Sequence, residues 1–297
     1  RPFVIAGPCS AETPDQVAKI CQEIADKKLA SMLRAGIWKP RTRPDSFEGI
    51  GEDALPWLVE AGKITGLPIT TEVANRTHVE QALKAGVDVL WIGARTTVNP
   101  FAVQEIADVL QGVNIPVMVK NPVNPDLELW IGAFERLEKA GVTDLVAIHR
   151  GFSVYKHDKY RNVPNWELPI ALKERRSDLP IICDPSHITG RRDLLLEVSQ
   201  KAMDLNFDGL MIETHPTPDQ AWSDAAQQVT ADGLEAILKA LVLRSKDVNS
   251  SVLAELEKFR AMTGGLDDRI FFLLAERMRI SEEIGQFKRS NNITILQ

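Results

Sequence analysis

The sequence predicts an α/β fold, namely a (β/α)₈ barrel with a C-terminal helical appendage. About eight short runs rich in Val, Ile and Leu recur along the chain, and segments with helical spacing of apolar residues separate them. The runs are almost continuously apolar, as in strands that are covered on both faces of a parallel sheet. About eight strand–helix units in about 245 residues match the size of a barrel, with a doubly wound open sheet as the alternative.

The expected strands follow one another along the chain, each with a helical segment behind it. Apolar residues three or four positions apart over 17–24 and 79–83 predict two of these helices, and Gly86 is a plausible terminator of the second. The strands are expected at residues 3–6, 31–34, 68–71, 89–92, 115–119, 145–148, 179–183 and 209–212.

The pattern changes after about residue 243, where we place the end of the barrel. Residues 244–252 are polar and predict a linker. Residues 253–297 have helical spacing, and we expect the pair Gly264-Gly265 to interrupt or cap this helix. The apolar row of the helix consists of Leu266, Ile270, Leu273, Ile280, Ile284 and Phe287.

Composition and charge exclude several classes of protein. A net charge of -6 gives the chain as a whole no attraction for nucleic acid or for acidic membrane surfaces. The three cysteines, Cys9, Cys21 and Cys183, are too few for a disulfide framework and indicate a reducing compartment. There is no apolar run of membrane-spanning length and no signal peptide, so we expect a cytoplasmic protein. Because the chain begins at Arg1 rather than Met, we expect that a few residues precede it.

Chemically active residues follow almost every expected strand, at the end of a barrel where function resides. One group of them combines a thiol, an imidazole and two carboxylates, which together suit a divalent transition metal. The loops after the first, seventh and eighth strands would bring this group together only if the barrel closes. Its members are Cys9, His187, Glu213 and Asp224.

The second group is basic. Four strand ends direct cations into one mouth of a protein whose net charge is negative, which predicts an anionic ligand with several charges. A phosphorylated small carboxylic acid together with a second phosphate would account for them, whereas nucleic acid would need an exposed stripe. The basic residues are Arg34, Lys39, Arg41, Arg95, Lys120 and Arg150.

Five motifs resemble those of 3-deoxy-D-arabino-heptulosonate 7-phosphate (DAHP) synthases, most closely the type I beta branch. They are Gly7-Pro8-Cys9-Ser10, Lys39-Pro40-Arg41-Thr42, Gly93-Ala94-Arg95-Thr96-Thr97, Asp184-Pro185-Ser186-His187 and Glu213-Thr214-His215-Pro216. The resemblance covers residues 1–243. It implies a (β/α)₈ barrel that condenses phosphoenolpyruvate with erythrose 4-phosphate and releases phosphate, the first step of the shikimate pathway.

The resemblance also assigns roles to the residues of both groups. It makes Cys9, His187, Glu213 and Asp224 the ligands of a divalent metal, with Mn²⁺ as the first choice and Fe²⁺, Co²⁺ or Zn²⁺ as alternatives. It places Arg95, Lys120 and Arg150 on phosphoenolpyruvate, with Lys39 and Arg34 beside it. Arg41 and Thr42 would hold the phosphate of erythrose 4-phosphate, next to Arg43, where the beta branch usually has Ser. Lys39, Cys9 and His187 are the expected catalytic residues, and Lys39 is a candidate proton donor to the aldehyde oxygen.

The C-terminal helix resembles the first helix of the all-α chorismate mutases, through Arg260, Leu266-Asp267, Ala275-Glu276-Arg277 and 284–288. Arg277 and Lys288 are eleven positions apart, about 1100° of helical rotation, and so share a face within about 20°. In that family such residues hold the carboxylates of chorismate.

The mutase fold has three helices in an intertwined dimer, and this sequence ends at Gln297, after the first helix. We therefore expect a longer bifunctional protein, a homodimer through these helices, and inhibition of the barrel by a pathway product such as prephenate.

Three alternatives stay open. 3-Deoxy-D-manno-octulosonate 8-phosphate synthases use arabinose 5-phosphate on a related barrel, but they typically have Lys-Ala-Asn-Arg where this chain has Lys39-Pro40-Arg41-Thr42. A regulatory or scaffold barrel without activity is the second alternative, and the complete set of four metal ligands argues against it. The third alternative concerns the C-terminal helix, which could be an amphipathic helix that packs on the barrel.

Overall fold

The structure is a computed structural model that describes residues 2–40, 45–155, 159–244 and 250–294. It divides into two compact units, Arg1–Leu243 and Arg244–Gln297. Each unit is described by itself.

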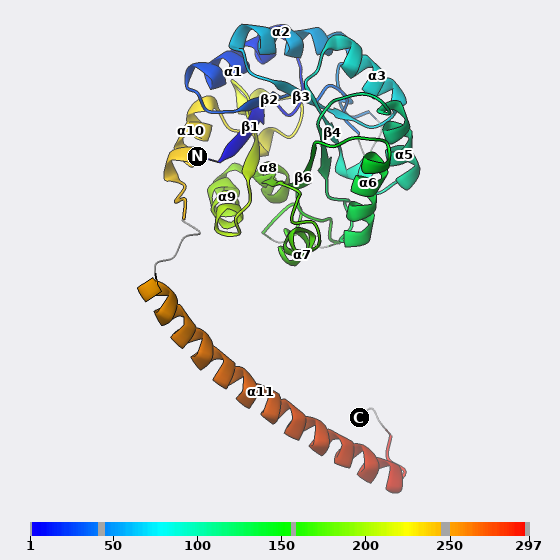
Figure 1. The fold of residues 1–297 in the computed structure, drawn as a ribbon, viewed down its shortest axis with the longest axis vertical. Coiled ribbons are helices and arrows are strands. Elements are labelled where there is room, and N and C mark those ends of the chain that lie inside the picture. The colour runs from blue at the N-terminus through cyan, green and yellow to red at the C-terminus, as the bar shows by residue number, and fades with distance from the viewer. Residues whose placement is uncertain (1, 41–44, 156–158, 245–249, 295–297) are drawn as a thin grey trace. The chain divides into compact units, whose positions relative to one another are not determined.

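The first unit is a closed barrel of parallel strands, which confirms the predicted fold class (Figure 1). Each strand pairs with the next one in the sequence, and the last pairs with the first through registers that include Gly7 opposite Glu213. This closure excludes the open sheet. The strands are β1 (Phe3–Gly7), β2 (Met32–Arg34), β3 (Ile69–Val73), β4 (Val89–Ile92), β5 (Val117–Lys120), β6 (Leu145–His149), β7 (Ile181–Cys183) and β8 (Gly209–Glu213).

Helices surround the barrel, and their ends follow local sequence signals (Figure 1). The Thr13 side chain accepts a hydrogen bond from Gln16 N at the start of α1, and Gly86, with φ 87°, ends α3 as expected. The outer helices are α1 (Pro14–Asp26), α2 (Leu55–Thr65), α3 (Arg76–Ala85), α5 (Pro100–Val109), α6 (Leu127–Lys139), α7 (Glu167–Arg175), α9 (Leu195–Asp204) and α10 (Ala231–Ala240). Shorter helices are α4 (Ala94–Thr97), α8 (Pro185–Thr189), η1 (Glu52–Ala54), η2 (Arg192–Leu194), η3 (Pro218–Gln220) and η4 (Ala225–Gln227).

Apolar side chains fill both sides of the strands. The larger buried cluster joins the strands to the surrounding helices, and a smaller one fills the barrel interior. The interior cluster consists of Ile5, Met32, Val89, Trp91, Met118, Ile148, Ile182 and Met211. Because the interior is packed, ligands can reach only the loops at the ends of the strands.

The second unit contains α11, a helix from Ser250 to Ser290. It begins within the expected linker, and it continues through Gly264 and Gly265, so the expected interruption there is wrong. Each glycine costs a helix about 1 kcal/mol relative to alanine but keeps its backbone N–H, and the good helix formers Ala261, Met262 and Leu266 lie close by. Among the described residues, none of the helices combines the length and apolar character that crossing a membrane requires.

Candidate active site

The closed barrel brings the four predicted metal ligands to one end of the strands. Cys9 follows β1, Glu213 is the last residue of β8, His187 lies in α8 just after β7, and Asp224 lies between η3 and η4. One ligand atom each from Cys9, Glu213 and Asp224 lies within 4.8 Å of the others. The Cys9 thiol is 3.3 Å from Oδ2 of Asp224, and Nε2 of His187 is 3.7 Å from Oε1 of Glu213.

In the absence of metal, only one of these four side chains, Cys9, carries a proton that it must lose to become a metal ligand. Burial, together with the charges of Glu213 and Asp224, raises the pKa of Cys9 to about 12. Burial lowers the pKa of His187, so its imidazole is neutral. Burial by itself would raise the pKa of Glu213 and of Asp224, but nearby positive groups hold both pKa values below their usual range.

The donor set fits a divalent transition metal. Oε1 of Glu213 is buried and has no hydrogen-bond partner among the residues that the structure describes. The Arg34 guanidinium lies 3.2 Å from this oxygen without donating a hydrogen bond to it, so the oxygen keeps lone pairs that a bound metal ion would occupy. A thiolate, an imidazole and two carboxylates can supply that coordination.

Asp184 holds His187 in place. Its side chain accepts a hydrogen bond from His187 N, which caps α8, and another from Nζ of Lys120 at 2.8 Å. Nδ1 of His187 lies 2.8 Å from Oδ2 of Asp184, out of line for a hydrogen bond. On the other side of the ring, Nε2 lies 3.7 Å from Oε1 of Glu213.

Four of the predicted basic residues line a hollow of about 70 Å³ beside these ligands, together with His187 and Asp224. They are Lys39, Arg95, Lys120 and Arg150. Nζ of Lys39 is 2.9 Å from the Cys9 sulfur. Burial lowers the pKa of Arg150 to about 10, so this side chain still carries its charge at neutral pH. The hollow therefore offers several positive charges to an anion.

Arg34 is not among the residues that line the hollow. Its side chain is 1% exposed, and Nη2 lies 3.2 Å from Oε1 of Glu213 and donates to the carbonyl oxygen of Cys9. The guanidinium stacks over the ring of Trp91, 4.8 Å from its centroid. Arg34 thus contacts a metal-ligand candidate directly. Arg41, Thr42 and Arg43 lie outside the described residues.

Strand-end reasoning did not single out three residues that the structure places at the site. Arg161 lines the hollow, Glu72 lies in its wall and accepts a hydrogen bond from Nε1 of Trp91, and Gln227 contacts Glu213. Glu72 directly follows the expected strand at residues 68–71 but lies inside β3, and the other two lie in the long segments that follow β6 and β8. The sequence signal that could have found Gln227 is its position three residues after Asp224.

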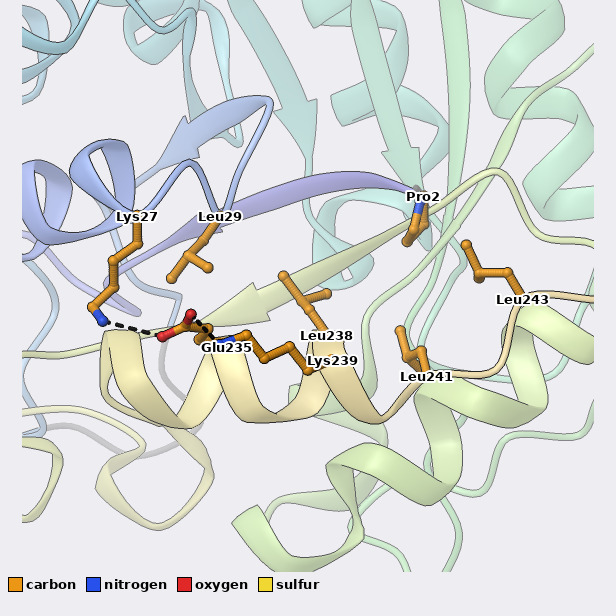
Figure 2. A pocket seen from close by; sticks show the side chains of 8 residues that line it. All are labelled: Pro2, Lys27, Leu29, Glu235, Leu238, Lys239, Leu241 and Leu243. Carbon is orange, nitrogen blue, oxygen red and sulfur yellow. Dashed lines mark hydrogen bonds and ion pairs between the residues drawn. The ribbon is translucent and has the colours of Figure 1, made fainter.

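The opposite end of the barrel has different chemistry. A hollow of about 410 Å³ there is lined by Pro2, Lys27, Leu29, Glu235, Leu238, Lys239, Leu241 and Leu243 (Figure 2). Glu235 pairs with Lys27 at 3.1 Å and with Lys239 at 2.5 Å, so it neutralises much of their charge. These residues lie around the amino-terminal ends of the strands, and the hollow does not combine the thiol, imidazole and excess of cations found at the carboxyl-terminal ends.

Comparisons with known proteins identify a family for this chain. A family model described as the DAHP synthetase I family matches residues 1–250. A phospho-2-dehydro-3-deoxyheptonate aldolase from Thermotoga maritima is 31% identical over 226 residues, which are 76% of this chain and 64% of that protein. This chain therefore spans less than two thirds of the length of that relative.

A second relative has a different printed name. A 2-dehydro-3-deoxyphosphooctonate aldolase from Dechloromonas aromatica is 27% identical over 283 residues, covering 86% of this chain and 95% of the relative. Among solved structures, the Thermotoga maritima phospho-2-dehydro-3-deoxyheptonate aldolase (DAHP synthase) superposes with a TM-score of 0.71 and 30% identity, over 80% of this chain and 67% of that one.

Proposed function

Since the chain belongs to the DAHP synthetase I family, we propose that it condenses phosphoenolpyruvate with erythrose 4-phosphate to give DAHP and phosphate. The observation that carries this proposal is a hollow lined by Lys39, Arg95, Lys120 and Arg150 beside the cluster of Cys9, Glu213 and Asp224, with His187 3.7 Å from Glu213. Phosphoenolpyruvate is a small trianion that needs several cations, and an aldehyde acceptor needs an electrophilic activator.

Cys9, His187, Glu213 and Asp224 would hold a divalent metal ion, for which Mn²⁺ is our first choice. When bound, the metal supplies Lewis-acid polarisation of the aldehyde. The cations of the hollow would hold the phosphate and carboxylate of phosphoenolpyruvate with its terminal carbon toward the aldehyde. The carbon–carbon bond forms there, water captures the neighbouring carbon, and cleavage of the carbon–oxygen bond releases phosphate.

Lys39 is the candidate proton donor to the aldehyde oxygen. Burial by itself would lower its pKa, but Cys9, Glu213 and Asp224 raise the pKa above its usual value. Lys39 is therefore an ammonium group at neutral pH, with a proton to offer beside Cys9. The phosphate of erythrose 4-phosphate is assigned to Arg41 and Thr42 from the resemblance alone, with Arg43 as the residue that departs from it.

The choice of aldehyde separates this proposal from its nearest rival, because the relatives include an enzyme named as an octonate aldolase. The test is consumption of phosphoenolpyruvate by chelator-treated protein, with and without added Mn²⁺, using erythrose 4-phosphate and arabinose 5-phosphate in parallel. We expect Mn²⁺-restored turnover with erythrose 4-phosphate only. Turnover with arabinose 5-phosphate alone would transfer the assignment to the rival synthase, and no turnover with either would favour the barrel without activity.

We also propose that α11 is the first helix of a chorismate mutase-like domain in a longer cytoplasmic protein. The supporting observation is that Arg277 stands in an apolar row, between Leu273 and Ile280, on a helix whose apolar side chains are exposed. Such a row indicates a partner, for which we propose the matching helix of a second copy. Arg260, Arg277 and Lys288 would then face the carboxylates of chorismate.

The tests of this second proposal are oligomeric state and inhibition. Leu273→Lys combined with Ile280→Lys should convert a dimer to a monomer in sedimentation measurements. Prephenate should inhibit the synthase activity of the chain and should inhibit the same double variant less. A monomeric unmodified chain, or equal inhibition of both proteins, would contradict the respective part of the proposal.

A further inference from the structure

Gln227 lies between the two carboxylates of the candidate metal centre. It is 1% exposed and belongs to η4. Its Nε2 donates to Oε2 of Glu213 at 2.6 Å, and its Oε1 accepts from Nη1 of Arg161 at 2.8 Å. The orientation of the amide follows from chemistry, because a guanidinium can only donate and an ionised carboxylate can only accept.

Arg161 connects the same amide to the second carboxylate. Its Nη1 also donates to Oδ1 of Asp224 at 2.9 Å. The chain Glu213–Gln227–Arg161–Asp224 therefore joins two metal-ligand candidates that are far apart in the sequence. Asp224 needs such support, since its backbone is in the left-handed region with φ 47°.

The backbone around Arg161 is itself anchored to the loop that carries His187. Asn162 Nδ2 donates to the carbonyl oxygen of His187 at 2.6 Å, and Asn162 N donates to that of Ile188 at 3.0 Å. The loop that carries Arg161 is thus bonded to the segment that carries a third ligand candidate. This arrangement fixes three of the four ligand positions relative to one another.

The consequence is that one oxygen of each carboxylate is occupied and the other is directed into the centre. Oε2 of Glu213 is bound by Gln227, while Oε1, which pairs with Arg34 at 3.2 Å without a hydrogen bond, lies 3.7 Å from Nε2 of His187. Oδ1 of Asp224 is bound by Arg161, while Oδ2 lies 3.3 Å from the Cys9 sulfur. Partners of this kind, one step removed from the metal, set the orientation and affinity of metal ligands.

We propose that Gln227, oriented by Arg161, is the positioning residue that presents Glu213 and Asp224 to the metal. The inference rests on the proposed function, because it requires a metal at the Cys9 centre. Without the amide, the buried Glu213 carboxylate loses a donor and turns toward Arg34. Arg34 is already 3.2 Å away, and its Nε and Nη1 lack hydrogen-bond partners within the described part of the chain.

The experiment titrates the chelator-treated full chain with Co²⁺ alone, in the absence of substrates. Binding is followed by the thiolate-to-cobalt charge-transfer absorption, and the midpoint of thermal unfolding is recorded without metal. Gln227→Met preserves size and neutrality but removes both hydrogen bonds. We expect its Kd for Co²⁺ to rise about 10- to 100-fold, the range typical of such second-layer partners.

Gln200→Met is the matched control. The amide of Gln200 also makes two hydrogen bonds, one with the N–H and one with the carbonyl oxygen of Val242, each at 2.9 Å. Gln200 belongs to α9, away from the strand ends that carry the site. We expect its Co²⁺ Kd to stay within about threefold of the unmodified chain. If Gln227→Met does not fold, Gln227→Asn replaces it, since the shorter amide cannot span both partners and should weaken binding in the same direction.

The outcomes separate the two proposals. If the unmodified chain binds Co²⁺ with thiolate absorption but the folded Gln227 variant binds it equally well, the positioning role of Gln227 is overturned and the metal centre stands. If the unmodified chain shows no thiolate–cobalt absorption, the metal centre itself is wrong. Weaker binding by both the Gln227 and the Gln200 variants would also overturn the inference, because the loss would not be specific to the centre.

Discussion

Metal binding at the Cys9 centre should release one proton at neutral pH. Burial and the neighbouring carboxylates raise the pKa of the Cys9 thiol to about 12, so the metal-free protein carries a thiol. A pH of 7.5 is about 4.5 units below this pKa, so deprotonating the thiol costs about 6 kcal/mol of the metal-binding free energy, at 1.36 kcal/mol per pKa unit. The other ligands release none, because the pKa of His187 is lowered by burial and those of Glu213 and Asp224 are lowered by positive neighbours.

The sign of the pH dependence follows from this count. The metal-free state binds one more proton than the metal-bound state, so rising pH favours the bound state. The apparent association constant should therefore increase about tenfold per pH unit between about pH 6.5 and 8.5. The assay is titration with Co²⁺ at three pH values, with a pH indicator in weak buffer to count protons released per metal bound.

Two variants define what the measurement means. Cys9→Ser should abolish the thiolate absorption and the proton release. Cys21→Ser should change neither, although burial also raises the pKa of that thiol to about 12, because Cys21 is in α1 and remote from the centre. Metal affinity that does not depend on pH would refute the reasoning about Cys9, and release of about two protons would mean that His187 is protonated in the metal-free protein.

Three further perturbations test the surroundings of the centre. The ammonium group of Lys120 lies 2.8 Å from the buried Asp184 carboxylate, so Lys120→Met leaves that carboxylate without its cation. We expect the free energy of unfolding in urea to fall by about 3–5 kcal/mol, and a loss below about 1 kcal/mol would contradict a buried pair. Arg150→Ala should raise the KM for phosphoenolpyruvate at least tenfold, which corresponds to a loss of about 1.4 kcal/mol or more of binding free energy. The KM for the aldehyde should rise much less, and equal changes in the two KM values would contradict the placement of Arg150 on phosphoenolpyruvate. Thr13→Ala removes the hydrogen bond that Gln16 N donates to the Thr13 hydroxyl at 3.1 Å and that caps α1. The free energy of unfolding should fall by about 1 kcal/mol, with no change in kcat or metal affinity.

Periodicity and strand ends were sufficient to predict the barrel and most of the residues at its mouth. Continuous apolar runs identify strands that are buried on both faces, and each run was found within a few residues of an observed strand. Local signals were equally direct at Gly86, where the left-handed backbone ends α3. The prediction failed at Gly264-Gly265, because a pair of glycines weakens a helix without removing its hydrogen bonds, and α11 continues through them.

By itself, the sequence determined the order of strands and helices, because that order depends on local periodicity. It also determined which thiol, imidazole, carboxylate and basic residues are available and the strand ends from which most of them project. Only the tertiary structure decided that Arg34 lies against Glu213, that Nε2 of His187 lies near the same carboxylate, and that Gln227 and Arg161 join the two carboxylates. The physical reason is that contacts such as Arg34–Glu213 and Arg161–Asp224 join residues far apart in the sequence, across loops whose path is set by closure of the barrel. The position of a residue relative to the end of a strand does not reveal which side chains of a neighbouring loop it contacts.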